Sequence, residues 1–470
     1  MEQKNLAAII FELENDRHLL DFKTYDNIPI WMISRWHLLH DIMGGILLNY
    51  KSPRHFRTIN FKMIGFLINV LAYNLTHKSN LKKKSIVLYS TNRKTIINDK
   101  FYNRYVDQLF EQFSSKSVVI EQALIDWEWP FPRKNEMIYF DTLGRITGEL
   151  KGRLQYKKDY NTVRELLDYL KKRMNLLTNI SLSDNEWSII AIYLSKLIVA
   201  MRFQAEWLGR RIDKETKMVI AVGAGFPYYY FTNKLLKSKG IVSVELQHGY
   251  ITKNNIMYNY AEKIVNDSRV VDGLPDYILT YGDWWNQQMN CPIKKVSIGN
   301  PYHELCVKNI EKIKKNNQDI VIIGVGENTR EYIKLSEYLS GNLKNYHIKF
   351  RPHPGEKNMA LKLMQEEQIN INLDKNIELY QTLQATSIII GEVSTVLFEA
   401  VGIVDRVLVW NTKYSQAYLP EHPFETFSSY EELVEKINSK NTLIYNRGDE
   451  FWCDNWEEKY IHFIKSSISI

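Results

Sequence analysis

The chain has 470 residues, of which 45% are hydrophobic and 13% aromatic, so it is too apolar for a disordered protein and too long for one ordinary core. Its net charge of +7 is unevenly spread: residues 1–300 carry 42 basic and 30 acidic side chains (net +12), and residues 301–470 carry 19 and 24 (net −5). We therefore expect two domains, the first facing an anionic partner such as a phospholipid surface, a phosphorylated acceptor or a nucleic acid.

The cysteines and the apolar stretches limit the protein class further. No C-x-x-C pair occurs among the three cysteines, which argues against a disulfide scaffold and a structural zinc site: Cys291, Cys306 and Cys453. The first residues lack the features of a secretory signal. The best apolar stretches, Met63–Tyr73 and Trp187–Phe203, are interrupted by Asn69 and Lys196, which favours amphipathic or buried helices over membrane spans. We expect a cytoplasmic protein.

Residues 1–84 are predicted to form a helical N-terminal extension, because apolar residues recur there at three- and four-residue spacing. From residue 85, short apolar runs alternate with helical patterns, which is typical of a parallel α/β sheet. A charged helical insertion is expected at 150–215. The predicted strands of this first lobe, 85–300, are Ser85–Tyr89, Ser117–Glu121, Met218–Val222, Val242–Leu246 and Tyr277–Thr280.

A second α/β series follows the turn at Gly299-Asn300-Pro301. The sequence thus predicts an α/β protein with two Rossmann-like lobes facing a cleft, the second lobe spanning 301–445. Residues 446–470 should form a helix that packs back on the body. The predicted strands of the second lobe are Ile320–Gly324, His347–Arg351, Ser387–Ile390 and Val407–Trp410.

The first candidate motif, Gln247-His248-Gly249-Tyr250, directly follows a predicted strand. Ligands of open α/β sheets bind at this carboxyl end. His248 there fits a general base or a donor to a phosphate, with Gln247 and Gly249 lining the cleft. The alternative is a histidine that only shapes its loop.

The second motif, Arg351-Pro352-His353-Pro354-Gly355, lies at a strand end of the other lobe. Two prolines restrict the backbone around His353, and a guanidinium can bind a phosphate or carboxylate through two hydrogen bonds. This combination favours recognition of an anionic nucleotide. The alternative is a proline-rich turn whose histidine is merely exposed.

The third motif, Gly391-Glu392-Val393-Ser394-Thr395, leads from a strand into a predicted helix. Free N–H groups and two hydroxyls at a helix start are suited to a phosphate, although Ser394 also fits an ordinary N-cap. Glu399, one turn further, is positioned for a ribose hydroxyl or a helix salt bridge.

Weaker signals surround these motifs. The turns at Gly223-Ala224-Gly225 and Gly324-Val325-Gly326 lack the third glycine of a dinucleotide fingerprint, so we interpret them as close-approach turns lining the cleft, with Glu327 pointing into it. Lys82-Lys83-Lys84, near Lys51, Arg54, Arg57 and Lys62, is either a solvated face or a membrane-facing patch. The chain contains no Walker A, G-x-S-x-G or H-E-x-x-H sequence.

Together, the Gln-His-Gly, Gly-Asn-Pro, Arg-Pro-His-Pro and Ser-Thr motifs resemble those of bacterial GT-B glycosyltransferases that build surface polysaccharides. The resemblance covers roughly residues 85–430. It points to the broad group of CDP-glycerol glycerophosphotransferases, capsular Kdo transferases and bacterial sialyl- and polysialyltransferases. It implies that His353, Pro354, Ser394 and Thr395 bind the donor and that His248 is the catalytic base or contacts the acceptor.

We therefore expect a metal-independent transferase that moves a sugar or polyol phosphate from a nucleotide-activated donor to a capsule, lipopolysaccharide or teichoic-type glycan. No resident cofactor is expected; the co-substrate is a nucleotide sugar, and the resemblance favours a cytidine nucleotide. Partners would be a glycan or lipid-linked acceptor and an anionic membrane at the inner face of the plasma membrane, with nucleic acid least expected. The alternatives are a GT-B sugar-nucleotide 2-epimerase and a non-catalytic scaffold of a polysaccharide assembly complex.

Overall fold

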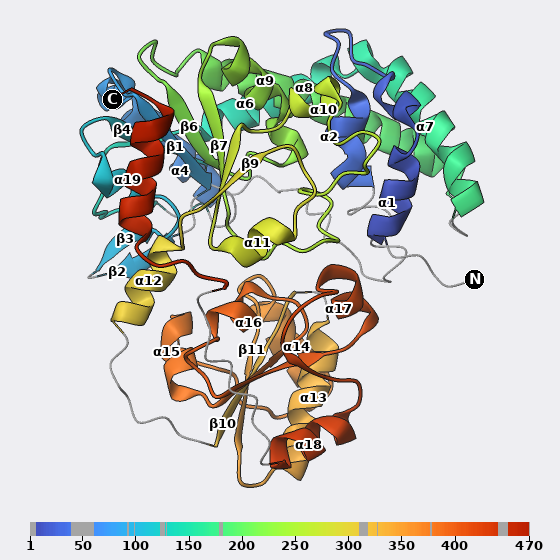
Figure 1. Ribbon diagram of the computed structural model, residues 1–470, viewed down its shortest axis with the longest axis vertical. Helices are drawn as coiled ribbons and strands as arrows, with labels where there is room; N and C mark the ends of the chain where they lie inside the picture. The colour runs from blue at the N-terminus through green and yellow to red at the C-terminus, as the bar shows by residue number, and fades with distance from the viewer. Residues whose placement is uncertain are drawn as a thin grey trace.

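The computed structural model describes residues 6–38, 61–91, 94–97, 99–122, 127, 129–177, 182–309, 318–326, 328–376, 378–439 and 450–469. Two α/β lobes lie one above the other in Figure 1. Each is built on a parallel sheet, as the sequence predicted. This confirms the expected class, an α/β protein with two Rossmann-like lobes.

The first lobe contains a seven-stranded sheet in the order β5-β4-β1-β6-β7-β8-β9, in which every pair is parallel. The strand β6 shows why these runs are continuously apolar: Met218, Ile220 and Val222 pack on one face, and Val219 and Ala221 pack on the other. The strands are β1 (Ile86–Thr91), β4 (Ser117–Gln122), β5 (Ile138–Phe140), β6 (Met218–Val222), β7 (Val242–Leu246), β8 (Tyr277–Thr280) and β9 (Lys294–Ser297).

Helices cover both faces of this sheet and include the predicted insertion. By length and composition α8 would suffice to cross a membrane, but 61% of its apolar window is buried in the protein, and it packs against α6, α7 and α9. The helices of this lobe are α5 (Asp107–Gln112), α6 (Thr142–Gln155), α7 (Lys157–Leu177), α8 (Asp184–Gly209), η4 (Pro227–Tyr229), α9 (Tyr230–Ser238), α10 (Ser268–Val271) and α11 (Asp283–Gln287). A short antiparallel hairpin, β2 (Lys94–Ile97) and β3 (Lys100–Asn103), follows β1.

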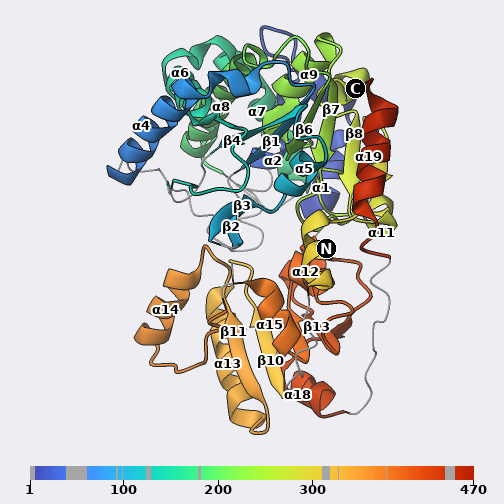
Figure 2. The ribbon, with the colours of Figure 1, turned by 90° about the vertical axis from the view of Figure 1, so that its left-hand side faces the viewer.

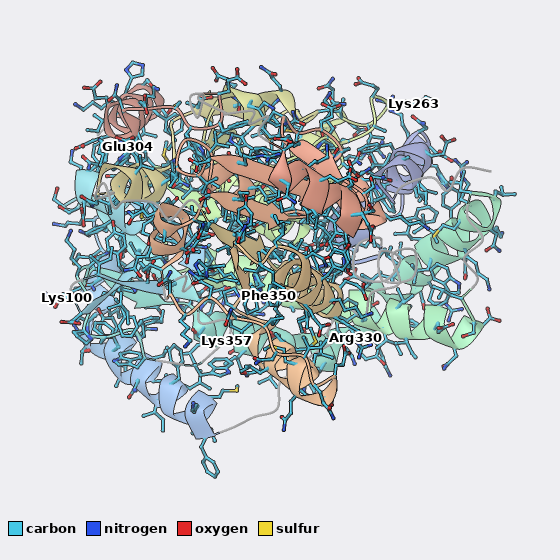
Figure 3. All side chains as sticks on the ribbon, turned by 90° about the horizontal axis from the view of Figure 1, so that it is seen from below. Lys100, Lys263, Glu304, Arg330, Phe350 and Lys357 are labelled. Carbon is cyan, nitrogen blue, oxygen red and sulfur yellow. The ribbon has the colours of Figure 1, made fainter. Side chains whose placement is uncertain are left out.

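The second lobe contains a five-stranded parallel sheet in the order β11-β10-β12-β13-β14. Figure 3 views the protein from this lobe's side and labels Phe350 of β11, which is fully buried. The strands are β10 (Asp319–Ile323), β11 (His347–Arg351), β12 (Ile388–Gly391), β13 (Arg406–Trp410) and β14 (Glu425–Phe427). Its helices are α13 (Thr329–Asn342), α14 (Lys357–Glu366), α15 (Leu379–Ala385), α16 (Thr395–Glu399), α17 (Lys413–Tyr418) and α18 (Tyr430–Asn438).

Both ends of the chain pack on the first lobe. The helices α1 (Leu6–Glu14) and α2 (Ile30–Trp36) dock through a buried ion pair between Arg35 and Glu14, whose carboxylate also accepts the Ala261 N–H. The helices α4 (Phe61–Thr76) and η3 (Lys78–Leu81) complete the extension. Two helices after residue 300 pack against α5 of the first lobe: α12 (Pro301–Lys308) and the last helix, α19 (Trp456–Ser467). The second sheet begins later than α12, at β10.

Aromatic side chains join the two lobes. Trp285 of α11 lies 4.8 Å, centroid to centroid, from Phe398 of α16, and its indole N–H donates to the Phe451 carbonyl. The Trp452 indole donates in turn to the Phe398 carbonyl at 3.2 Å. These residues belong to one core cluster that contains members of both lobes.

Candidate functional site

The predicted Gly324 turn and the third motif flank the point where the strand order of the second sheet reverses, between β10 and β12. Ligands of open α/β sheets bind at such a switch point. Gly324 follows β10, and Ser394 and Thr395 follow β12. His353 follows β11, whose end lies two strands, or about 10 Å, from the end of β12 along the same edge.

Arg351 does not extend toward this edge as an unpaired cation. Its Nη1 lies 2.5 Å from an Asp374 carboxylate oxygen and donates to Thr382 Oγ1 and the Asn376 carbonyl. The guanidinium that was expected to bind a donor phosphate is therefore already paired with groups of its own lobe. The guanidinium instead holds the segment between β11 and α15 in place.

A buried carboxylate, Glu356, fixes the His353-Pro354 turn. It accepts the His353 N–H at 2.6 Å and the Thr329 hydroxyl at 2.5 Å. A Cβ atom on Gly324 would lie 2.0 Å from Glu356 Oε1, so any side chain at position 324 would displace this carboxylate. The His353 and Pro354 side chains themselves are exposed.

The two hydroxyls that begin α16 have different roles. Ser394 is its N-cap and accepts the Val396 N–H at 3.2 Å; since α16 has five residues, its dipole is short. Thr395 Oγ1 accepts the Tyr250 N–H of the first lobe at 3.0 Å. The third motif therefore meets the first motif directly.

His248 follows β7 and has a buried carboxylate beside it. Glu245, inside β7, is fully buried, and its Oε1 lies 3.4 Å from His248 Nδ1. The same carboxylate accepts the N–H groups of Gly223 and Gly225, at 3.2 and 2.6 Å, and the Tyr258 hydroxyl at 2.9 Å. A carboxylate on the Nδ1 side leaves Nε2 as the nitrogen that can exchange a proton with a ligand.

This arrangement gives the predicted glycines different tasks. The N–H groups of Gly223 and Gly225 bind the protein's own Glu245, so that turn supports β7. Gln247 accepts the Tyr281 N–H and donates to the Gly249 carbonyl, both at 2.8 Å. Gln247 and Gly249 therefore shape the turn that carries His248.

Glu399, at the end of α16, lies where the lobes meet. Burial raises the pKa of this carboxyl, while Arg104 of the first lobe and a hydrogen bond from Tyr380 lower it. Its surroundings are therefore side chains of both lobes. Glu327 lies outside the described residues.

A cavity of about 560 Å³ opens at the switch point of the first sheet, between β1 and β6, and its lining includes Thr91 and Val222 from the ends of these strands. Three cations line it against one carboxylate, Glu149, so the lining is net positive: Arg145, Arg153 and Lys196. Tyrosines and amides complete the wall: Tyr89, Tyr193, Tyr228, Tyr229, Gln122 and Gln204.

The cavity adjoins the His248 site. Tyr228 lies 5.5 Å, centroid to centroid, from Phe226, which lies 5.4 Å from the His248 ring. The cavity cations could not be identified from the sequence, since Arg145 lies just before the charged helical insertion and Arg153 and Lys196 lie within it, where they look like any solvated residues. Glu245 was also missed, although a carboxylate inside the apolar run Val242–Leu246 was a visible signal. Among the described residues no group of three or more His, Cys, Asp or Glu is arranged to hold a metal ion.

No family model matches the chain, and no curated protein matches it. Solved structures show distant similarity. The wall teichoic acid polymerase TagF is 12% identical, with 87% of this chain and 99% of that chain covered and a TM-score of 0.43. The UDP-N-acetylglucosamine 2-epimerase from Rickettsia bellii is 10% identical over 82% and 96%, with a TM-score of 0.45, and TarM is 11% identical over 80% and 95%, with a TM-score of 0.38.

Proposed function

We propose that the protein is a transferase that moves a sugar or polyol phosphate from a nucleotide-activated donor to a surface-glycan acceptor, without a metal ion. The contact between Tyr250 and Thr395 is the observation that carries this proposal. It joins the loop of His248 to the switch point of the second sheet. This contact supports a mechanism in which His248 of one lobe would act at the ligand edge of the other.

The donor would bind at the carboxyl edge of the second sheet. Ser394, Thr395 and the exposed His353-Pro354 turn surround this edge. The N–H and hydroxyl groups of Ser394 and Thr395 and the imidazole of His353 would stabilise the negative charge of the departing nucleotide. Arg351 would act only by holding the turn, because it is paired with Asp374.

The acceptor would occupy the cavity of the first lobe. Its net positive lining fits a phosphorylated or otherwise anionic acceptor, and its tyrosines fit the faces of sugar rings. His248 Nε2 would take the proton of the acceptor hydroxyl. The nearby Glu245 carboxylate would stabilise the imidazolium that forms.

Donor binding and transfer can be tested separately. A nucleotide at one hundred times its Kd should stabilise the protein by about 2.7 kcal/mol, so thermal unfolding with cytidine, uridine and guanosine diphosphates should identify the donor base. We expect a cytidine nucleotide to be bound. His353→Ala should weaken this binding, whereas His347→Ala, an exposed residue at the opposite end of β11, should not.

His248→Ala should retain nucleotide binding and lose transfer by about 10²–10⁴-fold. Unchanged transfer would remove His248 from the mechanism. A reaction that converts the nucleotide sugar without any acceptor would favour the 2-epimerase. A protein that no nucleotide stabilises would favour the scaffold.

A further inference from the structure

The helix α4 buries one face and leaves a second apolar face uncovered. Phe66 and Val70 pack against Ile138 and Phe140 of β5. Five other apolar side chains are 45% to 93% exposed: Phe61, Ile64, Ile68, Leu71 and Leu75. Their spacing of three and four residues places them on one side of the helix. We call this set the α4 stripe.

The stripe stands at the margin of the first lobe. Figures 2 and 3 show α4 projecting from the side of that lobe. The neighbouring helix α6, which packs against α4, adds the exposed Leu150 and Leu154. The sixteen residues of α4 span about 24 Å, so the stripe is a continuous apolar row about that long.

Within the segment that forms α4 and η3, the charged side chains have one sign. Between Phe61 and Lys84 the chain carries five lysines and no Asp or Glu. Lys62, Lys78, Lys82 and Lys83 are exposed, whereas Lys84 is buried and donates to the Ser115 carbonyl, so it does not belong to the expected basic patch. The other expected members, Lys51, Arg54 and Arg57, lie outside the described residues.

We propose that the α4 stripe lies in the surface of an anionic lipid bilayer. An exposed apolar row bordered by lysines matches acyl chains beside phosphate headgroups. A second copy of the chain would bring the same lysines against one another in a two-fold contact, and lysine is depleted in protein interfaces. The helix does not span the bilayer, because its other face is packed on β5. This surface is independent of the transfer reaction.

Co-sedimentation of the full chain with vesicles tests the proposal without any activity measurement. We expect binding to phosphatidylcholine vesicles that contain 30% phosphatidylglycerol, and much weaker binding to pure phosphatidylcholine. Ile68→Ser with Leu71→Ser should lower partitioning at least tenfold, as two exposed apolar side chains are lost. Lys82→Gln and Lys83→Gln should each lower it about fivefold on anionic vesicles only.

Leu176→Ser is the matched control, because Leu176 is 83% exposed on α7 at the other side of the lobe. It should bind vesicles like the native chain, and thermal unfolding should show all variants folded. Native partitioning by the Ile68→Ser, Leu71→Ser variant, or no binding of the native chain to anionic vesicles, would overturn the proposal. A concentration-dependent dimer that this double variant abolishes would assign the stripe to a second copy and overturn it as well.

Discussion

Replacing Glu245 by glutamine distinguishes the contribution of this carboxylate to stability from its contribution to the proposed base, His248. Oε1 accepts the Gly223 N–H and the Tyr258 hydroxyl and faces His248 Nδ1, while Oε2 accepts the Gly225 N–H. Glutamine supplies one oxygen in place of two. At least one of these buried donors must then face an NH₂ group.

The expected loss of stability follows from that count. A buried donor left unpaired costs about 1–3 kcal/mol, and the remaining bonds lose the help of the negative charge. We expect Glu245→Gln to lower the free energy of unfolding by about 2–4 kcal/mol. Urea unfolding followed by circular dichroism measures this quantity.

The catalytic loss should exceed what unfolding explains. The imidazolium of His248 would lose its carboxylate, so kcat should fall by about 10²–10⁴-fold at a temperature where the variant is folded. Glu356→Gln is the matched control, since Glu356 is a buried carboxylate that also accepts the backbone N–H of a turn, here that of His353. It should lose comparable stability and raise the KM for the donor, with kcat retained. A Glu245→Gln protein that is destabilised yet keeps native kcat would refute the catalytic part of the reasoning.

Three further changes have defined outcomes. Burial raises the pKa of Asp141 to about 6. The folded protein therefore binds this proton more tightly than the unfolded chain, and stability is lost as pH rises from about 4 to 6. Urea unfolding at pH 4 and pH 7 measures this loss, and Asp141→Asn should reduce the difference in unfolding free energy between the two pH values by about 1–3 kcal/mol. Burial lowers the pKa of His303 to about 4, so stability is lost as pH falls from 6.5 toward 4, and the Tm of His303→Gln should fall less over that range. Thr395→Val removes the acceptor of the Tyr250 N–H, and hydrogen exchange of that amide should quicken about tenfold, whereas an unchanged rate would show that the bond does not restrain the lobes.

The interior strands of the two parallel sheets could be predicted from the sequence, and of their four edge strands only β11 could. Met218–Val222, Val242–Leu246, Tyr277–Thr280 and His347–Arg351 have the predicted bounds, because three of them are buried on both faces and read as continuous apolar runs. The strands β5, β9 and β14 were missed, and each lies at an edge of its sheet. They are three or four residues long, and β9 consists of Lys294–Ser297, so neither length nor apolarity marks them.

Chain order could place the motifs at strand ends but could not show what pairs with them. The sequence predicts that Arg351 lies at the end of a strand. It does not show that the guanidinium pairs with the carboxylate of Asp374, 23 residues later. Contacts between the lobes, such as that from Tyr250 to Thr395, join residues 145 positions apart. Only the tertiary structure determines which of the candidate cations remain available to a ligand.

The two lobes use a buried carboxylate in the same way, and this constrains where a phosphate can bind. Glu245 takes the N–H groups of Gly223 and Gly225, and Glu356 takes the N–H of His353. A phosphate could reach these groups only by displacing a buried carboxylate, which would then be left without its donors. The proposed donor contacts must therefore come from the groups that the carboxylates leave uncovered. Nucleotide binding by the second lobe, as proposed, is compatible with the net charge of −5 over residues 301–470, because its fixed turns, and not the total charge, would select the anion.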